Sequence, residues 1–367
     1  MHKVRNFLEN IIRIVNLKIS NTAWIGPAVV SFMVADSCDD RCIFCGDYSP
    51  YSKNPGNPYK REPIGAACFK NLIKDLRRLH VQKIILAGQG EPLCHPNIED
   101  FIKTGIENGL QVLVRTNGIA LKKKCKDLVY SGEVRYEISL HAAQPEIWQL
   151  IHTGRTAKDF QGILDYISVL PKKLRRNISL INVICQLNYR EAPGIIKLAH
   201  RLEIKEVYFQ LAIDRDLNDL GKSKVGLKEA EKPIILEKLL EAGENARRLK
   251  IKTNLGCIIS QIKSRFDSKP VDAPGGAAGL DKSTACYVGY LNTLISSDGD
   301  VLPCCNYGGS LGNIKDLSFS VIWNSPPYRD FRDYGKRGIL NRIPSCVYRE
   351  CQYYGLNKKV QRVYKNT

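Results

Sequence analysis

Three cysteines stand close together near the start of the chain. Cys38, Cys42 and Cys45 occur in the stretch DSCDDRCIFCGDYSP (Asp36–Pro50), directly after an apolar run. A structural zinc site uses four ligands, and the sequence offers no fourth ligand nearby. Three thiolates can instead hold three corners of a [4Fe–4S] cluster and leave one iron open to a further ligand. Zinc is the alternative, because cysteine triplets often bind it.

A second set of cysteines stands near the end of the chain. Cys286 and Cys304 flank the segment LNTLISSDGDVLP, whose Asp298–Gly299 pair predicts the turn of a β-hairpin. Such a hairpin brings the two thiols to the same end. Cys305 adjoins Cys304, and the hairpin spacing favours Cys304 as the ligand.

Cys346 and Cys351 follow the hairpin in a later segment. Together with the hairpin thiols they make four candidate thiolates, the number that a fully ligated [4Fe–4S] cluster uses. Zinc is again the alternative, because four-cysteine sites commonly hold it.

The elements that must position these groups are short apolar runs that alternate with amphipathic, helix-like segments. Six β–α units in series imply a parallel sheet, and six are fewer than the eight of a complete barrel. Ligands of such sheets lie at the carboxyl ends of the strands, where the polar groups of this chain cluster. The expected strands are Pro27–Ala35, Lys83–Gly88, Gln111–Gly118, Arg135–Ala142, Ile178–Asn188 and Glu206–Ala212.

The predicted fold class is therefore α/β, a partial (β/α)6 TIM-like barrel with a small C-terminal α+β domain. Residues 1–25 form an amphipathic helix, 26–250 the barrel, 251–285 a linker and 286–367 the domain of the second cysteine set. The first helix carries an apolar stripe, which we expect to dock against the bottom of the barrel. A membrane surface is the alternative, because basic residues flank the stripe. The stripe comprises Val4, Phe7, Leu8, Ile11, Ile12, Val15 and Ile19.

Composition restricts the class of protein further. The chain has 367 residues, 44% of them hydrophobic, thirteen cysteines and a net charge of +18. No apolar run is long enough to span a membrane. Without an export signal, so many thiols predict a reducing, cytoplasmic location rather than a disulfide framework. The charge favours acidic partners, although it forms no long basic block.

The cysteine triplet after the first strand of a β/α barrel resembles the radical S-adenosylmethionine (SAM) superfamily. In that superfamily SAM chelates the open iron, and an electron from the cluster cleaves it to a 5′-deoxyadenosyl radical that takes a hydrogen atom from substrate. The segment AGQGEP resembles the glycine–glycine–glutamate segment of the family, but Gln89 separates Gly88 from Gly90. The resemblance implies a set of cofactor-binding residues: Phe44, Gly88, Gly90, Glu91, Thr116, Asn117, Ser139 and Arg155.

Four of these positions carry a specific implied role. Glu91 would accept a hydrogen bond from the SAM ammonium, and Phe44 would lie against the adenine. Ser139 would contact the methionine carboxylate or the ribose. Arg155 stands where relatives place an arginine that binds the carboxylate.

The C-terminal segment resembles the SPASM/twitch extension of radical SAM enzymes, through DGDVLPCC, GNI, VIWNS and the last cysteine pair. The cysteine count favours the one-cluster, twitch form. The resemblance implies an auxiliary [4Fe–4S] cluster on Cys286, Cys304, Cys346 and Cys351. The last pair is CxxxxC where CxxC is commoner.

The expected reaction is hydrogen abstraction from a non-peptide substrate, namely a sugar, a nucleotide derivative or a lipid, with the auxiliary cluster assisting oxidation or electron relay. Peptide-modifying relatives often carry a leader-binding module, for which the residues before the first strand are too few. Flavodoxin or ferredoxin is the expected reducing partner. No catalytic side chain is assigned, although Cys257 or Cys185 could return a hydrogen atom to the substrate.

Three other functions remain open. A peptide- or protein-modifying SPASM enzyme is the first, and an RNA-modifying radical SAM enzyme is the second. The net charge favours RNA, but the sequence has no appended RNA-binding module and no aromatic-interleaved basic patch. The third is a non-enzymatic zinc or iron–sulfur protein, which would not need Glu91 or Ser139.

Overall fold

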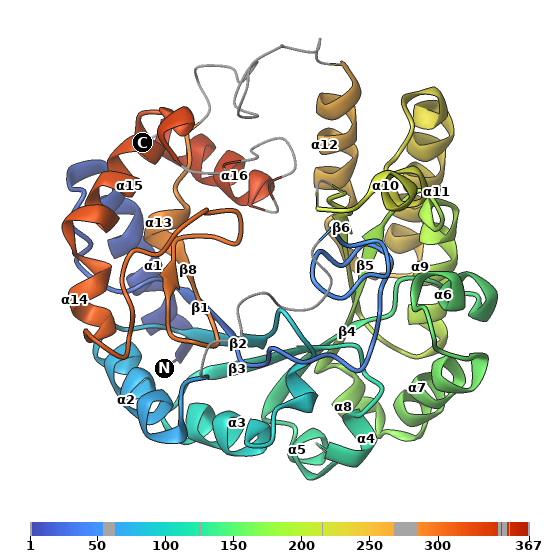
Figure 1. Ribbon diagram of the computed structural model, residues 1–367, viewed down its shortest axis with the longest axis horizontal. Helices are drawn as coiled ribbons and strands as arrows, with labels where there is room; N and C mark the ends of the chain where they lie inside the picture. Colours follow the sequence, from blue (N-terminus) through green and yellow to red (C-terminus); the bar gives the residue numbers. More distant parts are fainter. Residues whose placement is uncertain are drawn as a thin grey trace.

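The computed structural model describes residues 2–53, 63–124, 126–214, 216–267, 285–343, 346, 351 and 353–365. Their strands form one sheet in the order β7-β6-β5-β4-β3-β2-β1-β8-β9, which curves around a centre with the helices outside (Figure 1). The strands are β1 (Val29–Met33), β2 (Lys83–Ala87), β3 (Gln111–Thr116), β4 (Val134–Ser139), β5 (Ile178–Ile184), β6 (Glu206–Leu211), β7 (Lys252–Thr253), β8 (Asn292–Ile295) and β9 (Val301–Leu302).

The first six strands pair in chain order and are all parallel. Each coincides with a predicted apolar run, and helices lie between them in the sequence, so the α/β fold with a parallel sheet is confirmed. The main helices of this layer are α2 (Ala66–Arg78), α3 (Ile98–Glu107), α6 (Pro145–Ile151), α7 (Ala157–Val169), α9 (Ala192–Arg201), α10 (Asp219–Val225), α11 (Lys232–Arg248) and α12 (Leu255–Asp267).

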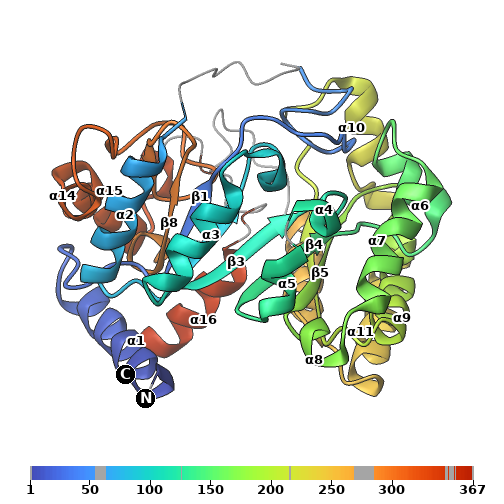
Figure 2. The ribbon, with the colours of Figure 1, turned by 90° about the horizontal axis from the view of Figure 1, so that it is seen from below.

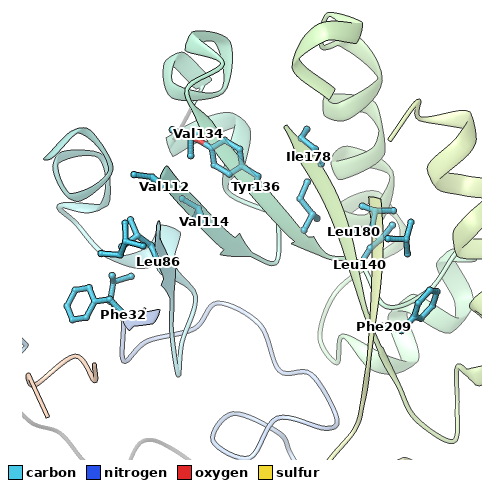
Figure 3. Packing of buried hydrophobic residues seen from close by; sticks show 14 of the residues in the cluster. Phe32, Leu86, Val112, Val114, Val134, Tyr136, Leu140, Ile178, Leu180 and Phe209 are labelled. Carbon is cyan, nitrogen blue, oxygen red and sulfur yellow. The ribbon is translucent and has the colours of Figure 1, made fainter. Parts of the chain in front are cut away.

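The two faces of the sheet differ in chemistry because successive side chains of a strand point to opposite faces. On β4, Val134, Tyr136 and Ile138 are buried, and the labelled side chains of this kind pack between strands and helices (Figure 3). The alternate residues Arg135, Glu137 and Ser139 line cavities on the inner face. The outer face is thus the hydrophobic core, and the inner face is available for chemistry.

The C-terminal region extends this sheet instead of forming a separate one. β8 pairs in parallel with β1, with Val30 opposite Thr293, and β9 pairs antiparallel with β8. Gly299 has a φ of +93°, as the predicted Asp-Gly turn requires. The helices of this region are α13 (Val288–Leu291), α14 (Phe319–Trp323), α15 (Pro326–Lys336) and α16 (Tyr354–Lys365).

The predicted linker is wrong over its first half. Residues 251–267 contain β7, which pairs with β6, and α12, whose Leu255, Ile258 and Ile262 are buried. These three residues belong to the same hydrophobic core as the buried residues of α11. The Pro- and Gly-rich stretch at 268–283 lies outside the described residues.

The first helix, α1 (His2–Ile19), is amphipathic as predicted, but the predicted orientation is wrong. Its polar residues Glu9, Arg13 and Asn16 are buried against the protein. Its apolar residues Phe7, Leu8, Ile11, Ile12, Val15 and Ile19 are exposed. The reason is that Arg13 finds backbone carbonyl partners at Gly26, Pro27 and His80, which a helical pattern does not reveal.

Candidate active site

The cysteine triplet lies on the loop that leaves β1, and its thiols are half-buried. The backbone N–H of Asp40 donates to Cys38 Sγ at 3.4 Å, and that of Tyr48 donates to Cys45 Sγ at 3.3 Å. Burial raises the pKa of all three thiols, that of Cys38 to about 12, so they hold protons until a metal displaces them. N–H groups aimed at sulfur are suited to stabilising metal-bound thiolates.

A buried acid–base pair holds this loop in place. His152 Nδ1 lies 2.5 Å from Asp40 Oδ2 and 3.6 Å from Cys42 Sγ, and its ring stacks on Trp148 at 4.2 Å. Burial alone would raise the pKa of Asp40, but the hydrogen bond and charge of His152 outweigh it and hold that pKa below its usual value. The sequence singles out neither Asp40 nor this pairing, because the two residues are far apart in the chain.

The AGQGEP segment runs beside the start of the cysteine loop. Gly90 N–H donates to Ala35 O at 2.9 Å, and Glu91 N–H donates to Ser37 O at 2.8 Å. A Cβ added at Gly90 would lie 2.0 Å from Ser37 O, and one at Gly88 would lie 2.3 Å from Gly90 O. Both glycines are therefore required by close backbone approach.

Glu91 is buried at the junction of β2 and β3. It accepts hydrogen bonds from Leu93 N–H at 3.0 Å, Thr116 Oγ1 at 2.6 Å and Asn117 N–H at 2.7 Å. Burial raises its pKa to about 7, although these donors act in the opposite direction. The Asn117 amide also donates to Asp39 Oδ1 at 2.8 Å, which ties the cysteine loop to β3.

A cavity of about 430 Å³ joins these groups at the carboxyl ends of the strands. We call it the upper cavity. Phe44 lines it and meets the His141 ring edge-on at 4.9 Å. The sequence-predicted residues that line it are Cys38, Cys42, Cys45, Phe44, Gly88, Gly90, Glu91, Thr116, Asn117 and Ser139.

The second set of thiols also gathers in space. Tyr353 N–H donates to Cys351 Sγ at 3.3 Å, and the Asn357 amide donates to Cys286 Sγ at 3.8 Å. Burial raises the pKa of Cys304 first, and the neighbouring Cys305, Cys286 and Cys351 raise it further. Burial is also the main cause that raises the pKa of Cys351, and the nearby Cys346 raises it further. The structure thus brings together the four predicted ligands and adds Cys305.

Comparison with known proteins decides the family. The radical SAM superfamily matches residues 33–199, and the iron-sulfur cluster-binding SPASM domain matches residues 286–352. The chain belongs to the radical SAM superfamily and carries a C-terminal SPASM domain. Its cofactors are SAM and [4Fe–4S] clusters. The two matches cover the two cysteine sets described above.

Two curated relatives indicate the range of the superfamily. A GTP 3′,8-cyclase of Limosilactobacillus fermentum is 32% identical over 158 residues, which are 41% of this chain and 45% of that protein. This alignment therefore spans less than half of the cyclase. An AdoMet-dependent heme synthase of Methanosarcina barkeri is 24% identical over 331 residues, which are 88% of this chain and 90% of that protein.

Solved structures show the same fold. SuiB of Streptococcus suis bound to S-adenosylmethionine has a TM-score of 0.62 and 16% identity, covering 87% of this chain and 71% of SuiB. The enzyme anSMEcpe with bound AdoMet has a TM-score of 0.64 and 14% identity, covering 93% of this chain and 97% of that one. At this identity the likeness concerns the fold alone.

The upper cavity fits SAM and its cluster. Its donor set combines three thiols for iron, the carboxylate of Glu91 for an amine and the hydroxyl of Ser139, beside the ring of Phe44. Its volume lies within the range of small-molecule sites. Cys38, Cys42 and Cys45 would hold the cluster there.

Two residues that were predicted to contact SAM or the substrate of this radical SAM chain lie outside the upper cavity. Arg155 was expected to bind the SAM carboxylate, but its guanidinium pairs with Asp39 at 3.0 Å and donates to the Asp39 carbonyl, outside the lining of the upper cavity. It stabilises the cysteine loop instead. Cys185 is fully buried and lines neither this cavity nor the one described next, so it cannot reach substrate there.

A lower cavity of about 510 Å³ continues through the inner face of the sheet toward the amino ends of the strands. Arg115 pairs with Glu137 at 2.8 Å, and Arg135 pairs with Glu206 at 2.8 Å. Lys83 and Cys257 also line it. The two cavities share the lining residues Arg115, Ile181, Gln210, Cys305 and Tyr353.

These charged residues were not predicted from the sequence to be part of a site. The signal was present, because Arg115, Arg135 and Glu137 interrupt apolar strands at alternating positions. A strand that faces an apolar core on one side and carries charge on the other must turn that charge toward solvent or a ligand.

Proposed function

We propose that this radical SAM enzyme abstracts a hydrogen atom from an anionic, non-peptide small molecule held in the lower cavity. A phosphorylated or carboxylated compound, such as a nucleotide derivative, has the required charge. The observation that carries this proposal is the ammonium of Lys83.

Lys83 begins β2 and lines the lower cavity. Burial lowers its pKa, the nearby Arg135 and Arg115 act in the same direction, and the carboxylates of Glu137 and Glu206 oppose them without reversing the shift. Among the described residues, no hydrogen bond or ion pair reaches its Nζ. A half-buried ammonium without a direct partner is costly, and an anionic group of a substrate would offset that cost.

The rest of the lower cavity is also positive. Four cationic side chains line it, Lys83, Arg115, Arg135 and Lys252, against the two carboxylates of Glu137 and Glu206. Both carboxylates are already engaged, since Lys252 also pairs with Glu206 at 3.3 Å. The excess positive charge attracts an anion and disfavours a cationic substrate.

The connection between the cavities determines how the substrate would be oriented. An anionic end held at Lys83 leaves the remainder of the molecule to extend past Arg115 toward the upper cavity, where Glu91, Ser139 and Phe44 would orient SAM. When bound, the cluster on the cysteine triplet supplies the electron for reductive cleavage of SAM.

The second cysteine set lies beside the same junction. Cys305 and Tyr353 line both cavities and adjoin Cys304 and Cys351, so the auxiliary site borders the junction. An auxiliary cluster there supplies an acceptor for one electron, which would make the net reaction an oxidation.

The name of one curated relative is compatible with an acidic small molecule. One relative is named for GTP, which is a polyanion, and the heme synthase aligns with nearly the whole chain. Neither name transfers directly, because the identities are low and the cyclase alignment is partial.

The test measures 5′-deoxyadenosine formation by anaerobically reconstituted protein with SAM, dithionite and candidate substrates. We expect stimulation by an anionic small molecule, and we expect Lys83→Met to raise its KM about tenfold, equivalent to about 1.4 kcal/mol. Lys74→Met, at an exposed position of α2, serves as the control and should leave KM unchanged. Stimulation by peptides alone, or by transfer RNA alone, would overturn the proposal in favour of the corresponding alternative.

A further inference from the structure

Helix α1 is fixed to the protein by its polar face. The Arg13 side chain donates to Gly26 O at 2.9 Å, to His80 O at 2.8 Å and to Pro27 O at 3.4 Å, and it is 2% exposed. These three hydrogen bonds from one buried side chain fix the rotation of the helix about its own axis. Turning the apolar stripe inward would break these bonds and leave the carbonyls of Gly26, Pro27 and His80 without this donor.

Other contacts on the same side of the helix reinforce this orientation. The carboxylate of Glu9 accepts from the Gln82 amide at 2.9 Å and lies 3.2 Å from His80 Nδ1. Asn16 donates to Thr22 O at 2.8 Å and accepts from Trp24 N–H at 2.8 Å. The chain after the helix is thereby held against it.

The opposite face of α1 is a continuous apolar surface, which we call the outward face. Its members are Phe7, Leu8, Ile11, Ile12, Val15 and Ile19, between 38% and 66% exposed. Trp24 follows the helix and is 51% exposed. Six large apolar side chains on one helix face form a contiguous patch, and apolar patches of this size are often interaction sites.

The size of this face argues against a second copy of the chain as its partner. A helix of 18 residues is about 27 Å long and about 10 Å wide, so its exposed face offers about 300 Å². A stable protein–protein interface buries about 800 Å² on each partner. A bilayer can accommodate a face of this size, because a single amphipathic helix buries its own apolar face at the boundary of headgroups and acyl chains.

Charge favours an anionic lipid surface. The only acidic residue of α1 is Glu9, which is buried and engaged, so the outward face carries no negative charge. Helix α16 lies beside α1 (Figure 2), where Leu17 and Val360 share a small core cluster, and its Lys359 and Arg362 are exposed. The whole chain carries +18, which adds long-range attraction to negative headgroups.

We propose that the outward face of α1 lies in the surface of an anionic lipid bilayer and anchors this enzyme there peripherally. No described helix is both long and apolar enough to cross the bilayer, so the contact is with one leaflet. This inference concerns a surface distant from the cavities and does not depend on the proposed substrate.

Trp24 provides a direct test, because the other two tryptophans, Trp148 and Trp323, are 0% exposed. Full-length protein is mixed under anaerobic conditions with vesicles of phosphatidylcholine, either pure or containing phosphatidylglycerol. We expect the fluorescence of Trp24 to shift to the blue and to be quenched by brominated lipid with the anionic vesicles. Trp24→Phe should abolish both signals. Absence of the shift, or equal binding to neutral vesicles, would contradict an anionic surface.

Vesicle flotation with variants tests the face itself. Leu8→Glu combined with Ile12→Glu should lower the fraction bound at least tenfold. The control is Leu240→Glu on α11, which is also an exposed leucine, at 58%, and should bind as the unmodified protein does. Ile19→Ser, at a 66% exposed position, is the milder variant should the double one fold poorly. Unchanged binding of both α1 variants, or a change of oligomeric state without lipid, would overturn the proposal, and the latter would assign the face to a second copy.

Discussion

The hydroxyl of Thr116 donates a 2.6 Å hydrogen bond to Oε1 of Glu91, so the end of β3 is joined to the residues that follow β2. Asn117 N–H donates to Oε2 of the same carboxylate at 2.7 Å, and the Asn117 amide donates to Asp39 in the cysteine loop. One buried carboxylate thereby aligns two strand ends with the cluster loop. Its protonation state should matter for the cofactor.

The pH dependence of SAM binding should report the raised pKa of Glu91. Burial raises that pKa to about 7, so the carboxylate is ionised above pH 7 and protonated below it. Only the ionised form accepts fully from the amino group of SAM, so affinity should rise as pH increases from 6 to 7.5 and fall about tenfold per unit on the acid side. Equilibrium dialysis with reconstituted protein measures this. Glu91→Gln should bind more weakly and without the pH step; a pH-independent affinity of the unmodified protein would contradict the role of Glu91.

Gly90→Ala should disrupt the cysteine loop. The added methyl group would lie 2.0 Å from the Ser37 carbonyl oxygen, so the AGQGEP segment and the loop must separate. Such overpacking costs about 1–3 kcal/mol and should lower the iron bound after reconstitution. The matched control is Gly162→Ala in α7, where the added Cβ meets nothing within 4 Å. We expect the control to be neutral or to stabilise the fold by up to about 1 kcal/mol. Normal iron content of Gly90→Ala would show that the close approach is not needed.

The first six strands and the location of the site could be predicted from the sequence. Apolar runs at Lys83–Gly88 and Gln111–Gly118 match β2 and β3 within two residues, because a strand buried on one face needs apolar residues at fixed spacing. The triplet Cys38, Cys42 and Cys45 and the acid Glu91 then fall at strand ends, where parallel sheets bind ligands. Local patterns were sufficient for these elements.

Features that depend on long-range partners could not be predicted. An amphipathic pattern in α1 defines two faces but does not say which one docks, and the carbonyl of His80 that holds Arg13 is 67 residues away. Arg155 was assigned to the cofactor by its position, whereas its partner Asp39 is 116 residues distant. The pairing of β8 with β1 could not be predicted for the same reason, because most of the chain lies between these two strands. Such pairings become visible only when the fold brings the residues together.

Removing one member of the buried Asp40–His152 pair should destabilise the protein strongly. Both side chains are at most 1% exposed, so Asp40→Ala leaves the imidazole buried without its charged partner. Loss of one partner from a buried pair costs about 3–5 kcal/mol. The exposed pair Glu244–Arg247 gives the control, since Glu244→Ala should change stability by less than about 0.5 kcal/mol. Anaerobic urea unfolding measures both. Equal midpoints for the two variants would show that the pair contributes little.

Alanine substitutions in the two cysteine sets should have different effects on activity. Alanine at Cys38, Cys42 or Cys45 should remove about four iron atoms per chain and abolish SAM cleavage, because the upper cavity then has no cluster to reduce SAM. Alanine at Cys286 or Cys351 should also remove about four iron atoms but leave SAM cleavage measurable, since these thiols do not line the upper cavity. Product formation should nevertheless stop, so 5′-deoxyadenosine accumulates without equivalent product. Iron analysis and product quantification on the same samples separate the cases. If Cys286→Ala retained full turnover, the auxiliary site would be structural, and the oxidation we propose would need a different electron acceptor.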